Sequence, residues 1–311
     1  MTRHAPPAAP ERAAGAAGAP VPADRSTRAV ALIVASAACF GSVVIFTELA
    51  KRAGASLATT MAGRYLAGGA LLLALGGGAR ALTRLPRRRV AALILAGGGG
   101  QATIAYLTLT ALDYVPAATV AFLFYTYPSW VAIFAVLRGS ERVGRTRGAA
   151  LALSLAGILL MVGSPWERAL DPRGVALALA GALVYALYIP LLQRLQAGVG
   201  AVPASTVLVA ATGVIFAVAG LLTGTLSVQL APAAWLWIAA LAVVCTAIAF
   251  IIFLRGLAVL GPVRTAIVST VEPFWTALLA IPALGQPLRP ATVAGGALIA
   301  AAVLLLQRRR G

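Results

Sequence analysis

Ten long apolar runs dominate this 311-residue sequence and limit what it can fold into. A helix needs roughly 20 mostly apolar residues to cross the hydrocarbon core of a bilayer. Runs of about this length lie at residues 29–49, 57–77, 90–110, 117–137, 147–163, 174–193, 204–224, 233–253, 263–284 and 291–306. Within each run the apolar residues are continuous and do not alternate with polar ones, as they would in the strands of a membrane barrel. The sequence therefore predicts an all-α membrane protein with ten transmembrane helices.

The composition agrees with this prediction, except at the two ends of the chain. Hydrophobic residues make up 61% of the sequence and charged residues 11%, against roughly 45–50% and about 25% in soluble domains. Residues 1–27 instead combine alanine, glycine and arginine with five prolines, and such a segment cannot bury a core. We expect a disordered cytoplasmic tail over 1–27 and a short basic cytoplasmic tail over 307–311.

The basic residues predict how the chain is oriented in the membrane. The formal net charge is +17, and nineteen of the 25 basic residues lie in the tails or in loops that follow even-numbered runs. Cytoplasmic loops carry the excess of Lys and Arg in membrane proteins, so we expect a multi-pass protein of the cell membrane with both termini in the cytoplasm. The basic clusters also suit anionic lipid headgroups, and they require no nucleic-acid partner.

The residue types needed for most enzyme chemistry are scarce. Cys39 and Cys245 lie inside apolar runs, and His4 in the N-terminal tail is the only histidine. These counts argue against a disulfide scaffold, a histidine-ligated metal and a Ser-His-Asp triad. The sequence lacks a Gly-x-x-x-x-Gly-Lys-Ser/Thr loop, and Lys51 is its only lysine, so the chain has no phosphate-binding loop with which to use ATP. We expect no enzymatic activity, no metal and no cofactor.

The chain repeats itself at an offset of 145 residues. At this offset Tyr127-Pro128-Ser129-Trp130 falls on Glu272-Pro273-Phe274-Trp275. The offset divides the spans into two sets of five, over 28–163 and 174–306. Because five is odd, the second set must enter the membrane from the opposite side. Two inverted five-helix repeats are the architecture of many secondary transporters, in which exchanging the conformations of the halves converts an inward-open state into an outward-open one.

Several short motifs resemble the EamA domain of the drug/metabolite transporter superfamily. In the first half, a proline-containing span leads to the turn Gly139-Ser140-Glu141-Arg142-Val143, and Arg64-Tyr65-Leu66 resembles a basic motif early in the second span. In the second half, Val271-Glu272-Pro273-Phe274 is followed by Gly285-Gln286-Pro287-Leu288. Ser140 is an extra residue and Gln286 replaces the usual Glu. Over residues 29–306 the resemblance implies a ten-span carrier with a central cavity between its halves and a small-molecule substrate.

Glu272 is the polar residue that most needs an explanation. An acidic side chain at the centre of a span costs roughly 2.5–3.5 kcal/mol on the insertion scale. Glu272 must therefore face a wet cavity, pair with a cation or be protonated. This makes it a candidate proton site or a partner for a substrate ammonium group. The alternative is a structural cap that satisfies backbone donors loosened at Pro273.

Other residues of the fourth and ninth spans are candidates for the lining of a substrate site. Pro128 and Pro273 predict two broken helices at similar depth. Aromatic residues crowd the fourth span, and of these we favour Tyr127 and Trp130, with Trp275 opposite, for the cavity. Hydroxyls are added by three further tyrosines, which are Tyr106, Tyr185 and Tyr188. Such a pocket suits a partly hydrophobic metabolite, and the alternative for each residue is core packing.

One further pair of charges is predicted near the outer ends of the first two spans. Glu48 and Arg64 face the same side, so a Glu48–Arg64 ion pair is expected, either structural or gating. Together these features favour a secondary transporter, most simply an exporter of amino acids, related metabolites or drugs that works by alternating access. The sequence leaves proton coupling and passive facilitation open, as well as substrate and oligomeric state. The alternative is a membrane scaffold or a lipid-handling protein.

Overall fold

The five apolar runs of the first half are helical, and the third and fourth spans are divided into four and two successive helices. A computed structural model describes residues 23–75, 86–138, 145–162, 169–196 and 201–307 of the chain, and every regular element within these ranges is a helix. Of the predicted tails over 1–27 and 307–311, residues 1–22 and 308–311 lie outside the described residues, as does the turn at 139–144. The prediction is wrong at residues 23–27, which form the start of α1, and at Gln307, which ends α14. The helices of the first half are α1 (Ala23–Arg52), α2 (Leu57–Leu75), α4 (Arg87–Ala92), η1 (Leu93–Gly98), α5 (Gly99–Thr110), η2 (Ala111–Asp113), α6 (Ala117–Phe124), α7 (Tyr127–Leu137) and α8 (Arg145–Val162).

The second half repeats this order of segments. Its helices are α9 (Pro172–Gln196), α10 (Ala201–Leu222), α11 (Pro232–Ala242), η3 (Val243–Ile248), α12 (Ala249–Ser269), α13 (Glu272–Leu284) and α14 (Pro290–Gln307). Six helices of the described chain are long and apolar enough to cross a membrane, and three shorter apolar helices lie within α8, α13 and α14. The prediction of an all-helical membrane protein is confirmed.

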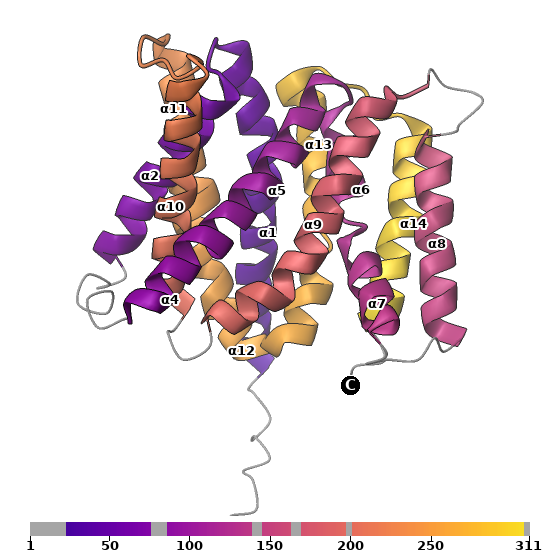
Figure 1. Cartoon of the computed structure of the whole chain (residues 1–311). Coiled ribbons are helices and arrows are strands. Elements are labelled where there is room, and N and C mark those ends of the chain that lie inside the picture. The colour runs from indigo at the N-terminus through magenta and orange to yellow at the C-terminus, as the bar shows by residue number, and fades with distance from the viewer. Residues whose placement is uncertain (1–22, 76–85, 139–144, 163–168, 197–200, 308–311) are drawn as a thin grey trace, which may run out of the picture.

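The two halves run in opposite directions. Figure 1 shows that α1 begins at the lower end of the molecule, whereas α9, the first helix of the second half, begins at the upper end. The end of α14 lies at the same end of the molecule as the start of α1. The architecture is therefore that of two inverted repeats, as the odd number of spans per repeat requires.

Helix contacts between the repeats follow the symmetry expected of an axis in the membrane plane. Equivalent helices pack against each other, namely α2 with α10 and α8 with α14. Non-equivalent contacts occur in matched pairs: α1 packs against α12 and α13, while α9 packs against α5, α6 and α7. Exchanging the two halves preserves these contacts. The contact of α6 with α13 is an exception, because α7 and the end of α12, the equivalent pair, make no comparable contact in the described chain.

Small residues allow the closest of these helix contacts. A Cβ atom added to Gly157 of α8 would lie 2.6 Å from the backbone oxygen of Gly295 on α14. On α1, a Cβ atom at Gly41 would lie 2.7 Å from the backbone oxygen of Glu272. Without aqueous hydrophobic driving force, membrane helices depend on such close backbone approach for their packing.

The boundary between the eighth and ninth spans differs from the prediction. The sequence places it near Arg255–Pro262, but α12 runs without interruption from Ala249 to Ser269, and the helix breaks instead at Thr270 and Val271. A proline inside a helix removes only its own N–H, and a membrane helix can continue past one where neighbouring groups compensate. Pro262 therefore does not end a helix, and the predicted ninth span is divided between α12 and α13.

Candidate functional site

Both repeats contain a broken helix at the same position. In the fourth span α6 ends at Phe124 and α7 begins at Tyr127, and in the ninth span α12 ends at Ser269 and α13 begins at Glu272. The 145-residue offset carries each of these boundaries onto the other. In each case a proline is the second residue of the new helix, and it lacks the N–H that would bond to the carbonyl four residues earlier. The prolines thus leave the carbonyls of Phe124 and Ser269 without their α-helical donors.

The carboxylate of Glu272 lies at the second of these breaks. The hydroxyl of Tyr125, which directly follows α6 in the opposite repeat, is 2.8 Å from Glu272 Oε2 and 2.8 Å from the backbone oxygen of Ser269. Tyr125 is buried, with 7% of its surface exposed. Among the described hydrogen bonds, none joins the Glu272 side chain to a backbone N–H, so a capping role has no described donor.

Glu272 differs from the other acidic residues in its partners. The other carboxylates whose side chains the structure describes pair with basic residues: Glu48 with Lys51 and Arg52, Asp113 with Lys51, and Asp171 with Arg173. Within the same described residues, the carboxylate of Glu272 bonds only to a neutral phenol. A carboxylate in a spanning region without a cation is held protonated or is available to a cation from outside the chain.

Aromatic rings from two spans gather beside this carboxylate. The Tyr127 ring packs edge-on against Tyr185 of α9, with centroids 4.8 Å apart, and against Tyr125 at 5.8 Å. Phe124 completes the group, with its centroid 5.2 Å from Tyr185 and 5.9 Å from Tyr127. We call these four residues the aromatic cluster. Of the residues favoured from the sequence, the structure places Tyr127 in this cluster, whereas Tyr125, the direct partner of Glu272, was not singled out.

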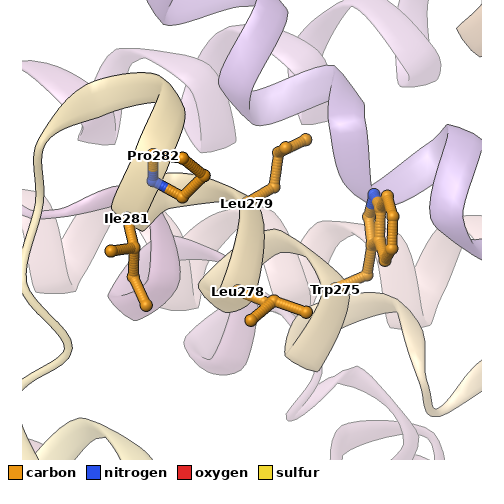
Figure 2. Close-up of a pocket in the computed structure, with 5 residues that line it drawn as sticks. All are labelled: Trp275, Leu278, Leu279, Ile281 and Pro282. Atoms are coloured by element: carbon orange, nitrogen blue, oxygen red, sulfur yellow. The ribbon is translucent and has the colours of Figure 1, made fainter.

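The two predicted tryptophans lie apart from this cluster in the described ring contacts. Trp275 Nε1 donates to Ser42 Oγ of α1 at 3.0 Å, and its ring lines an open apolar groove of about 270 Å³. Figure 2 shows Trp275 at one end of this groove, beside the neighbouring helix. The other lining residues are Leu278, Leu279, Ile281 and Pro282. Trp130 is partly buried, and its Nε1 has no hydrogen-bond partner in the described chain.

The other two predicted tyrosines have different surroundings. Tyr188 is buried, and its hydroxyl donates to the backbone oxygen of Gly97 at 2.7 Å, within the π-helical segment η1. The hydroxyl that the sequence offered to a substrate site is therefore bonded to the backbone in this structure. Tyr106 is 54% exposed, and no described ring contact joins it to the aromatic cluster.

The predicted Glu48–Arg64 pair is wrong. Arg64 is buried, with 8% of its surface exposed, and its Nε donates to Thr246 Oγ1 at 3.2 Å. Its guanidinium also lies 4.7 Å from the centroid of the Tyr65 ring. Glu48 is neutralised within its own helix by residues three and four positions later, a spacing that places side chains side by side. The local pairs at the end of α1 replace the predicted contact with α2.

Comparison with known proteins gives one family and one fold. The sequence profile of the EamA-like transporter family matches residues 27–163 and again residues 172–308. No curated protein matches the chain. One similar solved structure, a crystal structure with 22% sequence identity, covers 92% of this chain and 100% of its own, with a TM-score of 0.64. At this identity the match supports the fold alone.

Proposed function

Since the chain belongs to the EamA-like transporter family, we propose that it is a secondary transporter that exports small, partly apolar molecules by alternating access. Its substrates on this proposal are amino acids, related metabolites or drugs. The observation that carries the proposal is the pair of helix breaks at repeat-equivalent positions, one of which holds a carboxylate with no basic partner among the described residues. Broken helices between inverted repeats form the binding sites of many secondary transporters.

On this proposal Glu272 is the coupling or binding group of the site. A carboxylate that alternates between a proton and a substrate cation can link the two, because it cannot hold both at once. The aromatic cluster offers ring faces beside this carboxylate, and such faces attract ammonium groups. A substrate with an amine and an apolar side chain matches both features.

The function is tested by transport into vesicles. The purified chain, reconstituted into lipid vesicles, should move members of a panel of amino acids and cationic drugs faster than protein-free vesicles. Imposing a pH gradient distinguishes the two modes, since a proton-coupled carrier accumulates substrate against its gradient and a facilitator only equilibrates it. Absence of transport for every compound under both conditions would contradict the proposal.

The orientation in the membrane gives a separate prediction. We propose the cell membrane as the location, with both ends of the chain in the cytoplasm, since the basic loops follow even-numbered spans. A cysteine at Arg88 should react in intact cells only with membrane-permeant thiol reagents, whereas one at Ser227 should also react with impermeant reagents. Both positions are exposed. The unmodified chain, with Cys39 and Cys245 inside spans, gives the background. Labelling of the Arg88 position from outside would reverse the orientation.

Removing individual rings tests the proposed lining. We expect Tyr127→Ala and Trp130→Ala to slow transport roughly tenfold at equal expression, because on this proposal each removes an aromatic contact with the substrate that is worth up to about 1.5 kcal/mol. Trp275→Ala should act in the same direction from the other repeat. Trp235→Ala on α11, where the side chain is 41% exposed, is the matched control. Initial rates in vesicles measure the effect, and unchanged rates in all three variants would place the substrate elsewhere.

A further inference from the structure

The carbonyl of Ser269 has an unusual hydrogen-bond donor. In an uninterrupted helix it would accept from the N–H of residue 273, but that residue is proline and has none. The donor that replaces it is the hydroxyl of Tyr125, which lies 2.8 Å away, between α6 and α7 of the other repeat. The backbone at the α12–α13 break is therefore satisfied by a side chain from the opposite half of the protein.

The same hydroxyl also faces Glu272 Oε2 at 2.8 Å. A phenol has one hydrogen to donate, and a carbonyl oxygen or an ionised carboxylate can only accept. When Glu272 is ionised, Ser269 and Glu272 compete for that single hydrogen. When Glu272 is protonated, its own O–H can donate to the Tyr125 oxygen, and Tyr125 can then donate to Ser269. Only the protonated state satisfies all three groups.

We propose that Tyr125 is a relay that transmits the protonation state of Glu272 to the backbone break between α12 and α13. With a proton on Glu272, the chain of donors Glu272, Tyr125 and Ser269 holds the break closed against α6. Without that proton, Tyr125 turns its hydrogen to the carboxylate and releases the Ser269 carbonyl, which favours an open break that water can reach. This inference rests on the proposed function only for its use in transport, since the relay itself is a property of the folded chain.

Among the described groups around Glu272, only Glu272 itself is expected to change its protonation state near physiological pH. The described titratable groups that face it are Tyr125 and Tyr127 from the fourth span and Tyr185 from α9. On its other side, α1 presents Gly41 and Ser42, where the Gly41 carbonyl accepts from Thr276 and Ser42 accepts from Trp275. No described basic side chain pairs with the carboxylate. The three phenols stay neutral at physiological pH, because an unperturbed tyrosine has a pKa of about 10.

The relay exists in one repeat only. At the equivalent break of the first repeat, Tyr127 occupies the position of Glu272, and Thr270 occupies the position of Tyr125. The first break therefore has no carboxylate that could exchange a proton. A proton on Glu272 would act on the Ser269 carbonyl of the α12–α13 break through Tyr125, which itself lies between α6 and α7. Because the first repeat has no equivalent carboxylate, the proton would favour one of the two otherwise symmetric conformations.

Hydrogen–deuterium exchange of the chain in lipid nanodiscs tests the relay without requiring transport. After correction for the intrinsic pH dependence of exchange, the wild-type amides of residues 268–276 should exchange about tenfold faster at mildly alkaline than at mildly acidic pH, the effect of losing one buried hydrogen bond. Glu272→Gln should abolish this pH dependence. Tyr125→Phe should abolish it as well and should exchange fast at every pH. Tyr188→Phe, which also removes a phenol that donates to a carbonyl, should leave the wild-type pH dependence in 268–276 unchanged.

A further variant covers the case in which Tyr125→Phe fails to fold. Pro273→Ala restores an N–H at residue 273 and gives the Ser269 carbonyl its own donor, so exchange in 268–276 should become slow and independent of pH. A wild type without the pH dependence overturns the relay, as does a pH dependence that survives in Tyr125→Phe or in Pro273→Ala. If the exchange results hold but no substrate is moved in vesicles, the proposed function fails and the relay stands.

Discussion

Replacing Glu272 with Gln should eliminate most concentrative transport while leaving the protein folded and inserted. Gln has nearly the same size, and its amide oxygen can still accept the hydrogen bond that Tyr125 donates to Glu272 Oε2. It cannot gain or lose a proton or pair with a substrate cation, so only the charge change is removed. A residue that served purely as a hydrogen-bond acceptor at the helix break would tolerate the replacement.

Uptake into vesicles as a function of pH measures this effect. The wild-type uptake rate should change with pH, whereas the Glu272→Gln rate should be low and independent of pH. If Glu272 acts only in proton coupling, the variant should still exchange substrate down its gradient. Asp171→Asn is the matched control. Asp171 lies outside the spans, and the hydrogen bond from Arg173 lowers the pKa of its carboxyl. Asp171 therefore stays ionised at neutral pH, and its titration cannot change the transport rate there. Identical rates and pH profiles for wild type and Glu272→Gln would make Glu272 structural.

The fold could be predicted from the sequence because its determinants are local. Apolar runs of sufficient length predict membrane helices, and an odd number of them in each repeat requires the inversion that α1 and α9 display. Pro128 and Pro273 mark the two broken helices because proline removes a backbone donor wherever it lies. The boundary near Pro262 was wrong for a related reason: the loss of one donor did not end the helix there, and α12 continues to Ser269.

The partners of individual side chains could not be predicted in the same way. The repeat offset aligns Tyr127 with Glu272 and so drew attention to Tyr127, but the phenol that bonds to the carboxylate belongs to Tyr125. Which residue crosses from α6 to α13 depends on how the two helices are rotated at their breaks, and no sequence period encodes this. Likewise, Arg64 donates to Thr246 in η3, 182 residues away in the sequence, whereas the pattern of charges predicts Glu48 as its partner.

A leucine at Gly157 should destabilise the protein strongly, because it would separate the two helices that pair the ends of the repeats. A Cβ atom there would lie 2.6 Å from the backbone oxygen of Gly295 and 2.8 Å from Ile299 Cγ1. The Gly295 oxygen is part of the α14 backbone and cannot rotate away as a flexible side chain could. Inserting extra volume into a well-packed core costs about 1–3 kcal/mol, and occasionally more, and membrane helix pairs depend on small residues at their crossings.

The matched control lies on the same helix. Gly148→Leu places the same side chain on α8, where a Cβ atom would meet nothing within 4 Å, and leucine has a higher helix propensity than glycine, which is about 0.8–1.0 kcal/mol less favourable than alanine in a helix. Thermal unfolding in detergent should therefore show a lower Tm for Gly157→Leu and an unchanged or higher Tm for Gly148→Leu. Equal Tm values would mean that α8 and α14 can move apart at little cost. The contact between the last helices of the two repeats would then be a sliding surface, and stability would reside in the contacts of α1 and α2 with the second repeat.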